Sequence, residues 1–112
     1  MELINCSQIP ETGVSHDSSI RKRVLIENGR IPKLTNFSQS TIKPGQHCPA
    51  HTHPDMWEVY LVEAGQGIMV LNGQQINLQP GDCLIVEPGE EHSMQNHSAT
   101  DDVLLTYFGI EE

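Results

Sequence analysis

Turn-forming residues interrupt this chain at short intervals along most of its length. Between them lie runs of four to eight residues that are rich in aliphatic and β-branched side chains. No window shows the 3.6-residue periodicity of an amphipathic helix. Many short strands at this spacing predict an all-β sandwich or barrel. The turn signals are Asn28-Gly29, Lys43-Pro44-Gly45, Gly65, Asn72-Gly73, Pro80-Gly81 and Pro88-Gly89.

The predicted strands follow a mixed N-terminal segment. Residues 1–20 combine short apolar pieces with Pro10 and Gly13, which favours an extended arm that contains one strand at most. The remaining residues, 21–112, are the length of one small domain. Asn72-Gly73 gives the strongest hairpin signal, because both residues tolerate positive φ. The predicted strands cover residues 21–27, 36–43, 56–63, 67–71, 75–78, 83–86, 91–95 and 103–108.

Three histidines and one glutamate lie within two runs that glycines frame. The first run holds His51, His53 and Glu58, and the second holds His92. On an extended strand, the His-x-His spacing aims both rings to the same face. Three imidazoles and a carboxylate suit a divalent transition metal. The alternative is that these histidines are surface residues that only contact water.

The two runs resemble the two sequence motifs of the cupin family. The first run matches G-x5-H-x-H-x4-E-x6-G at every fixed position from Gly45 to Gly65. The second run resembles G-x5-P-x-G-x2-H-x3-N, with Glu87 in the usual proline position and Pro88 beside it. The resemblance covers roughly residues 22–109 and is to small, single-domain bacterial conserved-barrel cupins. It implies a double-stranded β-helix, the cupin jelly-roll barrel, with a metal inside one mouth.

The ligand chemistry narrows the choice of metal without selecting one. Four protein ligands leave an octahedral ion two open positions, which can hold water or a small molecule. A ligand set without thiolate disfavours copper(I) and a closed structural zinc site. We therefore expect each chain to bind one divalent transition metal ion. The candidate metals are Fe, Mn, Ni, Co and Zn.

Strand alternation also suggests residues that line the pocket. If Glu58 points into the barrel, Tyr60 shares its face, and Met94 shares the face of His92 in the same way. Both Tyr60 and Met94 are therefore candidates for ligand contact. The alternative for each is a place in the ordinary core of the barrel.

The other histidines and the tryptophan have no fixed place in the two motifs. His47 precedes His51 by an even number of residues, which makes it a candidate polar group of the pocket. His16 and His97 are expected on the surface. Trp57 lies on the strand face opposite Glu58, which argues against a role in the metal cavity.

The charge distribution restricts the partners. The formal net charge is −9, and all six basic residues precede the first motif. The absence of clustered cations argues against nucleic acid and against an anionic membrane surface as partners. A phosphate or di-acid usually needs Arg or Lys in its pocket, so we expect a neutral or singly charged ligand. The basic residues with a possible route into the pocket are Arg30, Lys33 and Lys43.

The N-terminus has no basic region followed by an apolar run, and three cysteines form no paired pattern. Both features favour a cytoplasmic protein with reduced thiols.

Three functions remain open from the sequence. The first is a mononuclear metal enzyme of dioxygenase, isomerase or lyase type, acting on a small oxygen-rich or enolisable molecule. The second is a non-enzymatic protein that binds or senses a small ligand through the metal. The third is a structural metal site without a ligand. No catalytic residue beyond the metal ligands can be assigned.

Several predicted strands are apolar on both faces. In residues 56–63, Tyr60 and Val62 lie on one face, while Trp57, Val59 and Leu61 lie on the other. A barrel wall needs only one apolar face, so the outer face requires a cover. A second copy of the chain is the simplest cover, and it predicts a homodimer.

Overall fold

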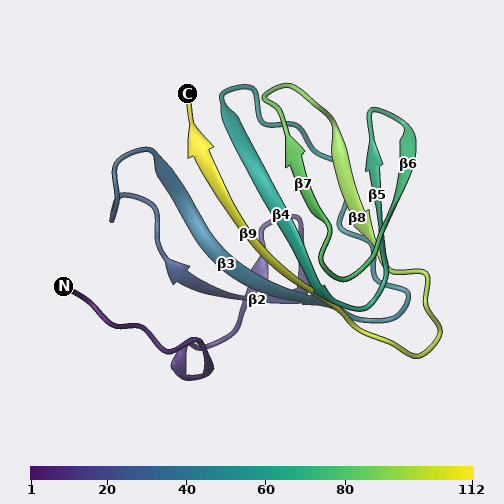
Figure 1. The fold of residues 1–112 in the computed structure, drawn as a ribbon, viewed down its shortest axis with the longest axis horizontal. Coiled ribbons are helices and arrows are strands. Elements are labelled where there is room, and N and C mark those ends of the chain that lie inside the picture. Colours follow the sequence, from purple (N-terminus) through teal and green to yellow (C-terminus); the bar gives the residue numbers. More distant parts are fainter.

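The computed structural model describes residues 1–112 and is almost entirely β-structure, in two antiparallel sheets (Figure 1). The larger sheet has the strand order β1-β2-β3-β9-β4-β7, and the smaller has the order β6-β5-β8. The all-β barrel predicted from the sequence is confirmed. The strands are β1 (Thr12–Val14), β2 (Asp17–Ile26), β3 (Leu34–Ile42), β4 (Met56–Ala64), β5 (Gly67–Leu71), β6 (Gln74–Leu78), β7 (Cys83–Val86), β8 (His92–Gln95) and β9 (Val103–Glu111).

The inward faces of the strands form one apolar core. Strand β4 shows the alternation most clearly, because Glu58, Tyr60 and Val62 are buried while Trp57 is 39% exposed. Burying each large apolar side chain contributes about 1.5–3 kcal/mol to stability. The core residues are Ile20, Ile42, Tyr60, Val62, Met69, Leu78, Val86, Met94, Val103 and Leu105.

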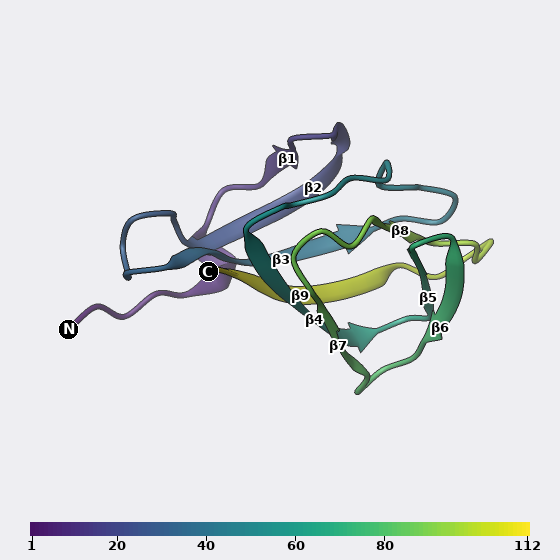
Figure 2. The same cartoon turned by 90° about the horizontal axis from the view of Figure 1, so that it is seen from above.

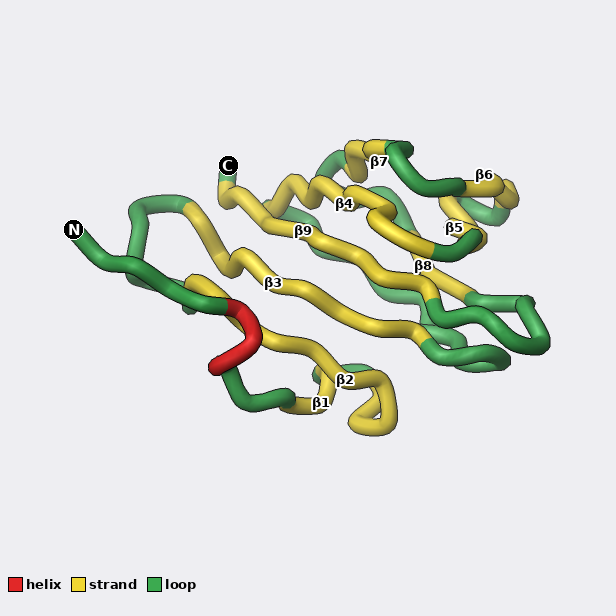
Figure 3. The backbone as a smooth tube through the Cα atoms, turned by 60° about the horizontal axis from the view of Figure 1, so that its bottom comes forward, coloured by secondary structure: helices red, strands yellow, loops and turns green.

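The N-terminal segment contributes more to the barrel than the sequence predicted. Strands β1 and β2 pair as a hairpin, and β2 runs through the predicted boundary between residues 20 and 21. Ile20 is 1% exposed and belongs to the core. The chain before β1 extends away from the sheets (Figure 2), and it carries the single 3-10 turn, η1 (Cys6–Gln8), shown in red in Figure 3. No helix of the chain is long enough to cross a bilayer.

Two local features bring the motif segments together. His51 and His92 exchange two backbone hydrogen bonds of 3.0 Å, which pairs the loop before β4 with the start of β8. Asn96 is fully buried, and its side-chain amide donates to the carbonyls of Ile42 and Asp101. These bonds fix the segment after β3 against the segment after β8, so they position the histidines of both motifs.

Candidate metal centre

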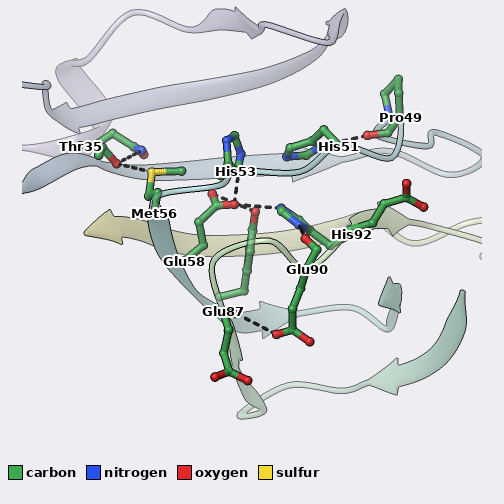
Figure 4. Close-up of polar contacts among 12 residues, drawn as sticks. Thr35, Pro49, His51, His53, Met56, Glu58, Glu87, Glu90 and His92 are labelled. Atoms are coloured by element: carbon green, nitrogen blue, oxygen red, sulfur yellow. Dashed lines mark hydrogen bonds and ion pairs between the residues drawn. The ribbon is translucent and has the colours of Figure 1, made fainter. Parts of the chain in front are cut away.

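The two sheets and one loop bring His51, His53, Glu58 and His92 to a single point. Their ligand atoms all lie within 4.8 Å of one another. Glu58 comes from β4 in the larger sheet, His92 from β8 in the smaller sheet, and both other histidines from the loop before β4. Figure 4 shows the side chains of His53, Glu58 and His92 directed toward one another, with His51 beside them.

Backbone carbonyls orient two of the imidazoles. Nδ1 of His51 donates to the carbonyl of Pro49 at 2.9 Å, and Nδ1 of His92 donates to the carbonyl of Glu90 at 3.0 Å. A proton held on Nδ1 leaves Nε2 free to coordinate a metal, and such a hydrogen bond also fixes the ring orientation. Both rings are therefore prepared to coordinate through Nε2.

Glu58 is the buried carboxylate of the cluster and is 5% exposed. Its Oε1 lies 2.8 Å from Nε2 of His92 and 3.3 Å from Nε2 of His53. Its Oε2 accepts a hydrogen bond of 3.1 Å from the Tyr60 hydroxyl. Tyr60 thereby occupies one carboxylate oxygen and leaves the other facing the imidazoles.

The ionisation of the cluster follows from these contacts. Burial alone would raise the pKa of Glu58, but the hydrogen bond and charge of His92 bring that pKa below its ordinary value. Burial likewise opposes the charged form of His92, yet the bond to Glu58 raises the pKa of His92 above its ordinary value. Burial lowers the pKa of His51, which keeps this ring neutral. In the metal-free protein, these directions and the 2.8 Å contact favour a proton on Nε2 of His92 that is hydrogen-bonded to Glu58.

The donor set fits a divalent transition metal. Three imidazole nitrogens and one carboxylate oxygen converge, and no thiolate takes part. Backbone carbonyls accept hydrogen bonds from Nδ1 of His51 and of His92, which fixes the orientation of both rings. A metal at this point would replace the proton between His92 and Glu58 as the positive partner of the carboxylate. The cluster predicted from the two motifs is thus assembled in space.

The ligand atoms face a cavity of about 170 Å³. Tyr60 and Met94 line it, as strand alternation predicted. The ring of Tyr60 stacks on Tyr107, with ring centroids 5.4 Å apart. Burial raises the pKa of Tyr60 well above its ordinary value and that of Tyr107 to about 12. Both phenols therefore remain neutral hydrogen-bonding groups and are unsuited to act as general bases at neutral pH.

The structure places the two histidines outside the motifs, His47 and His16, differently with respect to the cavity. His47 is exposed, lies outside the cavity lining, and has its ring 5.4 Å from that of His97. The even spacing to His51 is misleading because residues 47–51 form isolated bridges rather than a continuous strand. His16 is exposed, as expected, but it also borders the cavity and stacks on His51 with ring centroids 4.3 Å apart.

Lys22 also lines the cavity. It lies on β2, partly buried, where it pairs in register with Ser40 of β3. The prediction of a neutral or singly charged ligand rested on the absence of Arg and Lys from both motifs and the later strands, and Lys22 supplies a cation from the chain before them. No local pattern predicts the position of Lys22, because only the folding of the larger sheet brings β2 close to the metal ligands.

Comparison with known proteins relates this architecture to a large family. A curated oxalate-binding protein from Thermotoga maritima is 31% identical over 69 residues, which are 62% of this chain and 57% of that protein. An (R)-mandelonitrile lyase from Granulicella tundricola is 32% identical over 82 residues, 72% of this chain and 60% of that protein. The matched part of this chain thus spans less than two thirds of either relative.

The barrel also matches solved structures over its whole length. A crystal structure of a Thermotoga maritima protein described as a predicted oxalate decarboxylase superposes with a TM-score of 0.90. That match covers 99% of this chain and 100% of the other at 22% identity, which shows a shared fold. Residues 38–108 match the family described as the cupin domain. The barrel, the convergent ligands and this match agree, and the chain belongs to the cupin family.

Proposed function

We propose that this protein is a mononuclear metal enzyme that acts on a small oxygen-rich or enolisable molecule. The convergence of His51, His53, Glu58 and His92 on the wall of one cavity supports the proposal most strongly. Four protein ligands leave an octahedral ion two open positions, and the cavity provides space next to them. The ion is Fe, Mn, Ni, Co or Zn, one per chain.

The chain's own residues would bind and orient the small molecule. When bound, the metal supplies Lewis acidity toward a chelated carbonyl or enediol and, if it is iron or manganese, redox chemistry. Tyr60 holds Glu58 in place, while Tyr107 and Met94 form part of the cavity wall. His16 lies at the cavity as an imidazole outside the ligand set, so it is the candidate proton carrier for such a reaction.

A second function, metal-dependent binding without catalysis, is favoured by a different observation. Apart from His16 and the metal ligands, the polar groups that line the cavity include no base suited to neutral pH. One curated relative is described as an oxalate-binding protein, and another as a lyase. Binding and catalysis therefore both have support among the relatives.

Two measurements test these functions in turn. Elemental analysis should find one divalent ion per wild-type chain and a large loss in the His51→Ala/His53→Ala variant. Equal metal content in the two proteins would refute the metal site. Oxygen uptake by the iron-loaded protein should then be followed across small diols, diketones and phenols. Together with product analysis of the same mixtures, it separates turnover from binding alone.

The outer face of the larger sheet supports a further proposal, that the chain forms a homodimer. Trp57, Ile85 and Ile110 are 39%, 57% and 42% exposed. Trp57 pairs in register with Ile110, and Val59 pairs with Ile85, so these side chains adjoin on one face. Contiguous exposed apolar side chains of this kind mark interaction surfaces.

A further inference from the structure

Lys22 is the only cationic side chain in the cavity wall, apart from the histidines. It lies on the inward face of β2, two residues from the core residue Ile20. No carboxylate lies within ion-pair distance of its ammonium group, since the three ion pairs of the structure involve Arg30, His53 and His92. The ammonium group of Lys22 is therefore available to pair with a negatively charged group of a bound ligand.

The larger sheet curls so that its β1–β2 edge meets the metal-ligand loop. His16, in the turn between β1 and β2, stacks on His51. The side-chain amide of Gln46, in the same loop as His51, donates to the carbonyl of Ser19 on β2. Lys22 therefore lines the same cavity as Glu58, from a strand toward the opposite end of the sheet.

The charges of the loaded cavity determine the ligand that it favours. Glu58 is the only carboxylate among the lining residues, and it is a metal ligand. A divalent ion together with Lys22, offset by Glu58, leaves two positive charges in a cavity of about 170 Å³. Two positive charges that line one small cavity favour a ligand that carries negative charge. A doubly negative ligand would neutralise both charges.

We propose that Lys22 is a specificity residue that selects small dicarboxylates. One carboxylate chelates the metal, and a second carboxylate oxygen accepts a charge-assisted hydrogen bond from the Lys22 ammonium. A cavity of about 170 Å³ restricts the ligand to a few heavy atoms beside the metal. This inference rests on the proposed metal site, and it names the ligand class that the site takes.

Calorimetric titration of the manganese-loaded protein provides the test. The probes are oxalate, a dianion, and oxamide, its neutral diamide of similar shape. Loss of a charge-assisted hydrogen bond should weaken oxalate binding by about 10- to 100-fold in Lys22→Met. Oxamide binding should change by less than about twofold, because it carries no charge to pair with Lys22. Lys22→Arg should retain most of the oxalate affinity, because it keeps the positive charge.

The control variant is Lys43→Met, which removes the same charge from an exposed position outside the cavity lining. It should bind oxalate as the wild type does. Metal content and thermal unfolding, measured on every variant, confirm that each is folded and loaded. Oxalate binding that is unchanged in Lys22→Met, or equal losses for oxalate and oxamide, would overturn the role of Lys22 and leave the metal site standing. A wild-type protein that retains no metal would instead refute the proposed function, and this inference with it.

Discussion

The hydroxyl of Tyr60 decides which oxygen of Glu58 faces the imidazoles. It donates to Oε2, so Oε1 remains directed at His53 and His92. The tyrosine thus acts on the metal site through the carboxylate that it holds. Hydrogen bonds of this kind to metal ligands typically change metal affinity by about 10- to 100-fold.

Tyr60→Phe should therefore weaken metal binding by about tenfold without emptying the site. Phenylalanine retains the ring that stacks on Tyr107 and loses only the hydrogen bond to Glu58. Competition titration with a chelator measures the change. Tyr107→Phe is the matched control, because its hydroxyl makes no hydrogen bond to Glu58. An equal loss of metal affinity in both variants would show that Glu58 does not depend on Tyr60.

The proton between His92 and Glu58 predicts two pH effects of opposite direction. The pair stabilises the metal-free protein less as pH rises above neutral, while added metal stabilises the protein more. The raised pKa of His92 gives stability that is lost as pH rises through that pKa. The lowered pKa of Glu58 gives stability that is lost as pH falls through it. Both contributions are fully present between the ordinary values, pH 4.5 and 6.5, where the metal-free protein gains most from the pair.

Metal binding requires neutral imidazoles, so added metal should stabilise the protein more as pH rises. Between about pH 5 and about pH 8, the increase in melting temperature caused by saturating Mn(II) should grow steadily. Thermal unfolding with and without the ion, at several pH values, measures it. An increase that is constant across this range would contradict protonation of the ligand set.

At the level of single residues, the sequence predicted the ligands but not the groups around them. The four ligands have fixed spacing within two short sequence motifs, so they can be recognised from the sequence alone. They are His51, His53, Glu58 and His92. Lys22 and His16 reach the cavity only because β1 and β2 fold across it, about 30 residues away from the ligand loop in sequence. Contacts that depend on the curvature of a sheet leave no periodic signal.

Among the connecting turns, the one at Gly65 between β4 and β5 is tightly restricted. Gly65 has φ of +78°, and a Cβ at this position would collide with the carbonyl oxygen of Asp102. Gly73, in the β5–β6 hairpin, has φ of +81° but open space around the corresponding position. Both glycines have the same backbone conformation and differ in their surroundings.

Gly65→Ala should therefore destabilise the fold by roughly 3 kcal/mol or more, from left-handed strain combined with a backbone collision. Gly73→Ala should cost only about 1–2 kcal/mol, from the strain alone. Denaturant unfolding of the two variants against wild type separates these contributions. Similar losses in both would mean that the β4–β5 turn adapts to a side chain.

Strand positions were predicted best where turns are sharp. The Asn72-Gly73 hairpin was correct, with φ of +49° and +81°, and the bounds of β5 and β7 match those expected. The start of β2 was missed, because Asp17 and Ser19 read as loop residues. In the structure the Asp17 carboxylate accepts bonds from the amide and hydroxyl of Ser19, which stabilises the start of the strand. Tertiary pairing with β1 and β3 then outweighs the polar composition.

At the scale of the whole molecule, the larger sheet has one face in the core and one in water. The exposed side chains Trp57, Ile85 and Ile110 adjoin across β4, β7 and β9. Covering large apolar side chains stabilises an assembly by about 1.5–3 kcal/mol each when they become fully buried. A two-fold interface places the same patch against itself, so each residue contributes twice.

We therefore expect a dimer at micromolar concentration, measured by light scattering after size exclusion. The double variant Ile85→Glu/Ile110→Glu should be monomeric, because each interface would then bring four carboxylates into an apolar contact. Gln75→Glu, on exposed strand β6 of the smaller sheet, adds charge away from this face and should remain dimeric. Metal content should be equal in all three proteins, since the ligands lie on the inner side of the barrel. A wild-type monomer would show that this apolar face is stable in water, and a dimer that survives both glutamates would place the interface elsewhere.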